Sequence, residues 1–516
     1  LVRSRGLGDV YKRQEFDPDN IKYSCVRYSP SFIANAMGPS WSDPRTGEIL
    51  NASVYLYHNL VGLVRNWRFV QTAQADTDVR RKQLPTDILG DCISYVVAHE
   101  VGHTFAFMHN MAASSSIPVD SLRSASFTNK YGTTYSIMDY ARNNYVAQPG
   151  DKEKGVRLTP PDLGIYDYFS VKWLYSPIMS AKSSEEEIPI LRQWISEKLP
   201  DPAYRYGRQQ IRTRIDPSSF EEDLGDDPVK ASSYGVMNLK YILSQMNEWI
   251  KDDVEGDFRK EIYNEIIGQY IRYINNVLFN IGGIYVNEHY EGDPFPSYVP
   301  VTKEKQRESL KFLWEQALDC SWIDEPALQK ILPLHSNLSS VIENLIIDYV
   351  LKRFPSVAIC GDKMEQNPYT QLDYMDDLYY YMFMVPDKKN VLSASEKNMQ
   401  LKFVSYLMNG IKTVKKGSAA GTSGRMLTDE RIPLPEGIVA PTYLYDGPLN
   451  HFNDPKEVMG FEDTVSVTIP VESMEHHYYS MLRKIERLAK NRMSAGSDEN
   501  RTHYRLLVYK ISQSLK

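Results

Sequence analysis

Asp91 to Met111 read DCISYVVAHEVGHTFAFMHNM, and this stretch contains the motif HExxH at residues 99–103. A stripe of residues spaced by three and four positions is apolar except for two histidines: Leu89, Cys92, Val96, His99 and His103. That spacing is typical of one face of an α-helix, so both imidazoles project from the face that packs inward. Buried histidines need partners, and one zinc ion binds neutral imidazole nitrogens from both. The stretch therefore predicts a helix that carries two zinc ligands.

Two further residues of this stretch are candidates for the site. Glu100 lies about 100° further round the helix than His99, which places its carboxylate beside the metal as a general base. A catalytic zinc usually has three protein ligands and one open position, and His109 is the candidate for the third ligand. His109 follows His103 by six residues, so it can join the other ligands only if the helix ends between them. We expect the chain to turn near Ala106, where a left-handed alanine costs roughly 1 to 2 kcal/mol.

Composition excludes several classes of protein. The chain has 516 residues, of which 42% are hydrophobic and 24% charged, as in ordinary globular proteins with several domains. The net charge of −7 comes without a basic patch, so nucleic acid is not an expected partner. No apolar run approaches the roughly 18 residues that span a bilayer, so no transmembrane segment is expected. Four widely spaced cysteines form neither a disulfide framework nor a thiolate zinc site.

The pattern along the chain predicts an α+β fold followed by a mainly helical region. Residues 1–14 are expected to be foreign, because DVYKRQ at residues 9–14 matches one reading frame of a common sequencing adapter. Residues 15–180 mix short apolar stretches with turns and are predicted to form the catalytic domain, with a strand at Asn51 to His58 that could lie at a sheet edge. Residues 181–230 are charged and interrupted by proline, and we interpret them as a connecting segment.

Helical periodicity dominates residues 231–415, which are predicted to form a helical domain. Apolar residues recur at helical spacing in five segments: Asn238 to Ile250, Phe258 to Phe279, Lys303 to Leu318, Ser339 to Arg353 and Glu396 to Val414. Residues 416–516 are expected to contain a flexible linker, which begins at Lys415, one strand at Thr464 to Val471 and a basic helix.

Asp223 to Pro228 (DLGDDP) has two interpretations. Its carboxylates could hold calcium. Asp227 before Pro228 is also typical of a helix start, with an N-cap followed by proline at the first helical position. The sequence favours the helix start.

Ser136 to Tyr140 read SIMDY, and together with HExxHxxAxxH they resemble the metzincin clan of zinc proteases. The clan has glycine where this chain has Ala106. Three further segments are similar to the bacterial Met-zincin family of large zinc-dependent metalloproteases: Ala34 to Gln74, Pro118 to Gly132 and Tyr145 to Asp151. The resemblance covers roughly residues 20 to 240. It implies a metzincin-like catalytic domain, with Met138 as an apolar floor beneath the metal and Tyr140 as a stabiliser of the oxyanion.

The resemblance also implies Zn²⁺ as cofactor, a peptide or protein as substrate, and an extracytoplasmic location in the periplasm or at the cell surface. The ligand pattern with Glu100 favours a zinc metalloendopeptidase. Two alternatives stay open: an inert zinc-containing binding protein, and a zinc hydrolase that acts on a bond other than a peptide. No motif in the chain predicts an oligomeric state.

Overall fold

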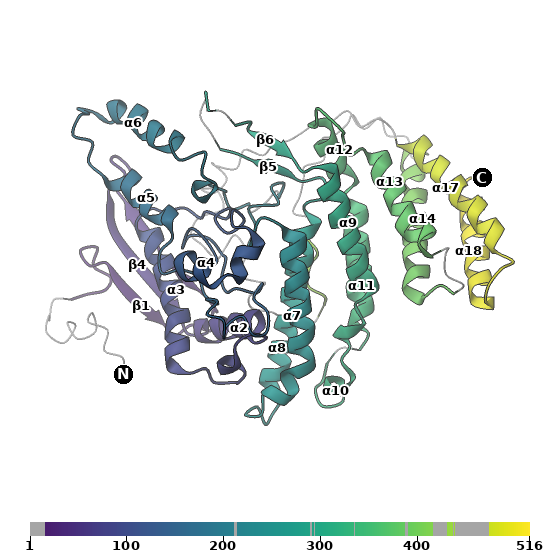
Figure 1. Ribbon diagram of the computed structural model, residues 1–516, viewed down its shortest axis with the longest axis horizontal. Helices are drawn as coiled ribbons and strands as arrows, with labels where there is room; N and C mark the ends of the chain where they lie inside the picture. Colours follow the sequence, from purple (N-terminus) through teal and green to yellow (C-terminus); the bar gives the residue numbers. More distant parts are fainter. Residues whose placement is uncertain are drawn as a thin grey trace.

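Four strands form a small mixed sheet near the N-terminus in the computed structural model, at the opposite end from the C-terminal helices (Figure 1). The structure describes residues 16–210, 214–288, 292–293, 295–334, 336–386, 391–415, 431–436, 438 and 474–516. Strand β4 (Ile49–Tyr57) pairs in parallel with β1 (Cys25–Ser29). On its other side β4 pairs antiparallel with β2 (Ala36–Met37) and β3 (Ser40–Ser42).

The predicted strand at Asn51 to His58 is therefore confirmed as β4, but its proposed edge position is wrong. Strand β1 covers one side of β4, whereas β2 and β3 share the other side. Alternating β-forming residues predict a strand, but its neighbours depend on segments elsewhere in the chain. The edge opposite β1 belongs to β2 and β3.

Helices α2 (Leu60–Thr72) and α3 (Thr86–Thr104) pack against each other and α3 packs on the sheet. Their shared core buries the predicted apolar stripe of α3 together with residues from α2 and β2: Ala36, Leu60, Leu63, Val64, Trp67, Cys92 and Val96. The short helix η1 (Thr77–Val79) lies between α2 and α3 in the chain. Five shorter elements follow α3: η2 (Val119–Arg123), α4 (Ala125–Tyr131), α5 (Ile165–Tyr175), α6 (Ser184–Ser196) and η3 (Pro202–Tyr204).

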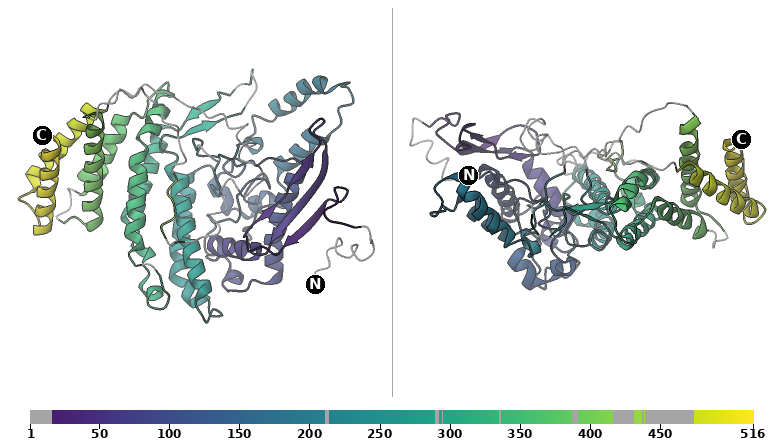
Figure 2. Two further views of the ribbon diagram at one scale, coloured as in Figure 1. Left: turned by 180° about the vertical axis from the view of Figure 1, so that it is seen from behind. Right: turned by 90° about the horizontal axis from the view of Figure 1, so that it is seen from above.

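The long helices of the second half stand side by side and extend away from the sheet (Figures 1 and 2). They are α7 (Pro228–Trp249), α8 (Asp257–Leu278), α9 (Lys303–Leu318), α11 (Leu338–Lys352), α14 (Ala394–Lys415), α17 (Glu475–Arg492) and α18 (Asp498–Ser514). Between them lie β5 (Ile284–Val286), β6 (Tyr298–Pro300), η4 (Ser321–Ile323), α10 (Pro326–Gln329), α12 (Phe354–Asp362), α13 (Gln371–Tyr379) and η5 (Tyr380–Met384). The five helices predicted from periodicity are confirmed.

Helix α7 begins ten residues before the apolar pattern that predicted it, and its start confirms the capping interpretation of DLGDDP. The Asp227 carboxylate accepts hydrogen bonds from the backbone of Val229 and Lys230, and Pro228 occupies the first turn. These bonds satisfy N–H groups that have no partner inside the helix.

One buried apolar cluster links the two halves of the molecule. It runs from Phe69 in α2, through α7 and α8, to Ile511 in α18. The α+β part followed by a mainly helical region is thus confirmed, whereas the domain boundaries stay predictions. No helix in the described part of the chain is long and apolar enough to cross a membrane. Residues 1–14, the strand at Thr464 to Val471 and the linker after Lys415 lie outside the described residues.

Candidate metal centre

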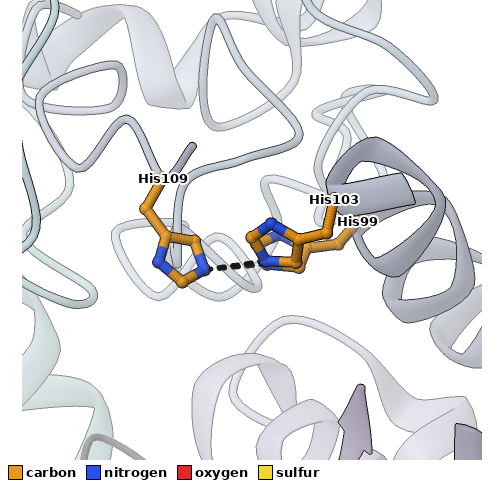
Figure 3. Close-up of side chains that lie close together, drawn as sticks. All are labelled: His99, His103 and His109. Carbon is orange, nitrogen blue, oxygen red and sulfur yellow. Dashed lines mark hydrogen bonds between the residues drawn. The ribbon is translucent and has the colours of Figure 1, made fainter. Parts of the chain in front are cut away.

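The structure brings the three predicted ligands together. His99 and His103 project from α3, and His109 approaches them from the loop that follows (Figure 3). The Nε2 atom of His109 lies 3.2 Å from Nε2 of His99 and 3.1 Å from Nε2 of His103. Two nitrogens bound to a tetrahedral zinc at 2.0 to 2.1 Å lie about 3.3 Å apart. The three imidazoles therefore fit around one zinc ion.

The predicted turn near Ala106 is confirmed and explains how His109 reaches the helix-borne pair. Ala106 has φ 62°, in the left-handed region. The N–H of Phe107 donates to the Gly102 carbonyl at 3.1 Å, and the N–H of Ala106 donates to the His103 carbonyl at 2.9 Å. These two bonds are those of a Schellman ending, which stops a helix and reverses the chain. Alanine thus takes the conformation for which glycine is usually selected.

Each ligand is oriented by a hydrogen bond at its other ring nitrogen. The Nδ1 atoms of His99, His103 and His109 lie 2.7, 2.9 and 2.8 Å from the oxygens of Ile137, Phe107 and Gln209, respectively. The carbonyl and amide oxygens can only accept, so Nδ1 carries the proton and the Nε2 lone pair points at the metal position.

Burial favours the neutral, metal-binding form of the ligands. It holds the pKa of His99 well below its ordinary value and lowers the pKa of His103 to about 4. Both imidazoles are therefore neutral at neutral pH, as zinc ligation requires. Sequence reasoning missed Gln209, because it comes 100 residues after His109 and no local pattern marks it.

Met138 lies in the core beneath α3, where the family resemblance places an apolar floor. Its sulfur occupies the space above Gly102, since a Cβ added at Gly102 would lie 2.3 Å from Met138 Sδ. The Met138 carbonyl accepts from the N–H of Asn110, next to the third ligand. Asp167, at the start of α5, accepts a hydrogen bond from Ser136 Oγ at 2.7 Å and thereby stabilises the turn that contains Met138. Sequence reasoning did not identify Asp167.

Glu100 is only 2% exposed, next to the ligands on α3. Burial raises the pKa of its carboxyl to about 8, and a backbone hydrogen bond from Gly38 opposes that shift. The Oε2 atom has no hydrogen-bond partner among the described residues. A buried carboxyl oxygen without a partner indicates that a group outside the protein, such as a water molecule or substrate, completes this site.

Gly38 lies between β2 and β3 and packs closely against the backbone of α3. A Cβ added at Gly38 would lie 2.1 Å from the backbone oxygen of Glu100, so only glycine fits there. Its contact with α3 was not predicted, although Gly38 lies within a segment that carries the family resemblance.

Tyr140 packs against two of the ligands. Its ring centroid lies 5.4 Å from that of His99 and 4.9 Å from that of His109. The Tyr140 carbonyl accepts a hydrogen bond from the N–H of Glu222, which fixes the chain just after Met138. The structure therefore places Tyr140 at the metal centre, and its role in catalysis stays a prediction.

Comparison with known proteins identifies one family. Residues 81–390, more than half of the chain, match the family described as Met-zincin. Comparison with curated proteins and with solved structures gave no match. The matched range includes the ligand-bearing helix, the loop to His109 and the turn around Met138. The chain therefore belongs to the Met-zincin family, which points to a metalloprotease-like hydrolase with bound zinc.

Proposed function

We propose that this protein is a zinc-dependent endopeptidase in which His99, His103 and His109 hold the metal and Glu100 is the general base. One observation carries the proposal. Three Nε2 atoms converge with their Nδ1 atoms already bonded, and a buried carboxylate oxygen without a partner lies on the same helix. Three neutral imidazoles leave a fourth position for substrate and water, as in catalytic rather than structural zinc sites.

When bound, zinc supplies a Lewis acid that polarises the scissile carbonyl and acidifies the attacking water. Glu100 then takes the proton from that water and returns it to the leaving amine. The carboxylate is suited to both steps because Gly38 holds it through a backbone hydrogen bond while Oε2 has no described partner. Tyr140, packed beside His99 and His109, stabilises the negative charge that develops on the carbonyl oxygen.

The substrate in this proposal is an extended peptide that pairs with β2 and β3. These strands, rather than β4, form the sheet edge on this side, and Gly38 between them touches the backbone of Glu100. Pairing of main-chain groups with an exposed edge gives affinity that is largely independent of side chains. The family resemblance supports an extracytoplasmic setting as part of the same proposal.

Zinc content and cleavage of a quenched peptide library test this function. We expect about one zinc per chain in the wild type and loss of cleavage on treatment with a chelator. Glu100→Gln should keep the zinc and lower cleavage by roughly a hundredfold to ten-thousandfold. Glu185→Gln, at the exposed start of α6, is the matched control and should cleave as the wild type does.

Each contrary outcome identifies a different error. Zinc binding without cleavage of any peptide by the wild type would favour the inert binding protein. Cleavage of esters but not of peptides would favour a zinc hydrolase of another bond. Absence of zinc from the wild type would show that the ligand assignment is wrong.

A further inference from the structure

A cavity of about 370 Å³ lies beside the part of α3 that precedes the histidines. It is lined by Ser94 and Tyr95 of α3, Trp67 of α2, and the loop residues Arg142, Arg157 and Thr159. All of its lining residues on α3 lie between Asp91 and Ala98, before the first histidine of the metal centre. Its volume is in the range of small-molecule sites, roughly 300 to 1,000 Å³. We name it the arginine pocket.

The inner wall of the arginine pocket is positively charged. Arg142 and Arg157 both line it, whereas the two carboxylates in the lining, Asp91 and Asp162, are exposed at the rim. The ion-pair partner of Arg142 is Glu222, which is not among the lining residues. Glu222 also lies 3.5 Å from Arg272.

Arg157 is held in place but its charge is only weakly compensated. Its Nε donates to Thr159 Oγ1 at 3.1 Å, and its Nη2 lies 3.5 Å from the fully exposed Asp162 carboxylate. Its backbone N–H donates to Thr128 Oγ1, and its carbonyl accepts from the Asn144 side chain. An exposed pair at that distance contributes little energy, so an anionic ligand can displace Asp162.

The rest of the wall is rigid and partly apolar. Pro160 and Pro161 pack against Gly132, where an added Cβ would lie 2.4 Å from Pro161. The Arg142 guanidinium stacks over the Trp67 ring, with its Cζ atom 3.5 Å from the ring centroid. The Tyr95 hydroxyl donates a hydrogen bond to the Asp139 carbonyl. These contacts fix the lining before a ligand binds, which lowers the entropy lost on binding.

We propose that the arginine pocket binds a small organic molecule with an apolar body and one oxyanion group, a carboxylate or a phosphate. Arg157 binds the oxyanion through its planar guanidinium, with the Ser94 and Thr159 hydroxyls beside it. The apolar body lies along Trp67 and Tyr95. The arginine pocket shares Trp67, Tyr95 and Arg142 with the smaller cavity that contains His99, Glu100 and Tyr140. Anion binding by Arg157 does not depend on the proposed peptidase activity.

Isothermal titration calorimetry on the zinc-loaded full chain at fixed ionic strength tests the proposal with three probes. Benzoate carries a carboxylate, phenyl phosphate carries a phosphate, and benzyl alcohol is neutral. We expect saturable binding of at least one anion and none of benzyl alcohol. The tighter of the two anions identifies the oxyanion that the pocket prefers.

Two variants locate the binding. Arg157→Gln removes the positive charge and should weaken binding of the anion by at least about tenfold. Ser94→Phe, at an exposed helix position, fills the pocket and should have an effect of the same size. Arg81→Gln, an exposed arginine outside the pocket, is the control and should bind as the wild type does. Melting temperatures close to that of the wild type would show that the variants are folded.

An anion that coordinates zinc instead would lose binding when the metal is removed and would bind Arg157→Gln unchanged. That result would overturn the proposal, as would the absence of saturable binding of either anion to the wild type. Loss of binding in both pocket variants, with binding kept after removal of zinc, would establish the site.

Discussion

At Ala106 the backbone adopts φ 62°, and for a residue with a Cβ this conformation costs roughly 1 to 2 kcal/mol. We predict that Ala106→Gly raises the free energy of unfolding by about 1 kcal/mol, because glycine adopts the same conformation without strain but loses more entropy on folding. Urea unfolding of the zinc-free protein measures the change without a contribution from the metal.

Ala98→Gly is the matched control, because Ala98 lies inside α3 with helical geometry. There the same substitution should lower the free energy of unfolding by about 1 kcal/mol. Equal losses in both variants would show that Ala106 is not strained.

Gln209 orients His109 through the hydrogen bond between Oε1 and Nδ1. We predict that Gln209→Ala weakens zinc binding by about 10-fold to 100-fold, because the imidazole then loses the partner that fixes its tautomer and ring orientation. Competition with a chromophoric chelator measures the affinity. Gln193→Ala, an exposed glutamine on α6, should leave zinc affinity unchanged. Equal affinity in both variants would contradict this role for Gln209.

The ligands on α3 could be predicted because the helical period relates residues that are close in sequence. His99 and His103 share one face for that reason, and the requirement for a third ligand indicated both His109 and the turn at Ala106. Gly38 and Gln209 reach the site from distant segments. A single sequence carries no signal for such contacts, because they depend on how whole elements pack.

At the scale of elements, the start of α7 could be predicted from nearby residues, whereas the position of β4 in the sheet could not. The start of α7 follows from Asp227 and Pro228, which lie directly at the helix end. The central position of β4 depends on β1 and β3, whose pairing partners are at least seven residues away in the chain. Local chemistry therefore predicts where an element begins, whereas tertiary packing decides which elements pair.

His503 on α18 joins that helix to α14 and gives the interface a pH dependence. Its Nε2 lies 2.8 Å from Gln400 Oε1, and the Gln400 amide donates to the Met382 carbonyl. Burial, reinforced by Lys397, lowers the pKa of His503 to about 4. As the pH falls below about 6.5 the unfolded chain binds a proton that the folded chain does not, so stability is lost until about pH 4.

We predict that His503→Gln lowers the free energy of unfolding at pH 7.5, and that this deficit shrinks by about 2 kcal/mol near pH 5. The wild type loses stability over that interval through His503, and the variant has no such group. Urea unfolding of both proteins at the two pH values gives the difference in free energy of unfolding between wild type and variant. The contributions of all other titrating groups cancel in this difference. A deficit that is constant with pH would contradict the assignment.

At the scale of the whole molecule, the segment before α7 connects the helical region to the candidate metal centre. Glu222, in the loop before α7, is fully buried and accepts hydrogen bonds from Gln71 of α2 and Gln269 of α8. The same carboxylate pairs with Arg142 at 2.6 Å, and the Glu222 N–H donates to the Tyr140 carbonyl. One side chain thus connects both halves of the chain to the segment that follows Met138.

We predict that Glu222→Gln lowers the free energy of unfolding by about 3 to 5 kcal/mol, because it removes a buried carboxylate that pairs with the buried Arg142 and Arg272. Glu261→Gln is the matched control at the same junction between α2 and α8. Glu261 pairs with Arg65 at 2.7 Å but is 37% exposed, so its removal should cost less than about 1 kcal/mol. Urea unfolding of both variants gives the two values. Similar losses would mean that burial of the Glu222 network adds no stability, and that the helical region supports the metal centre through its apolar core alone.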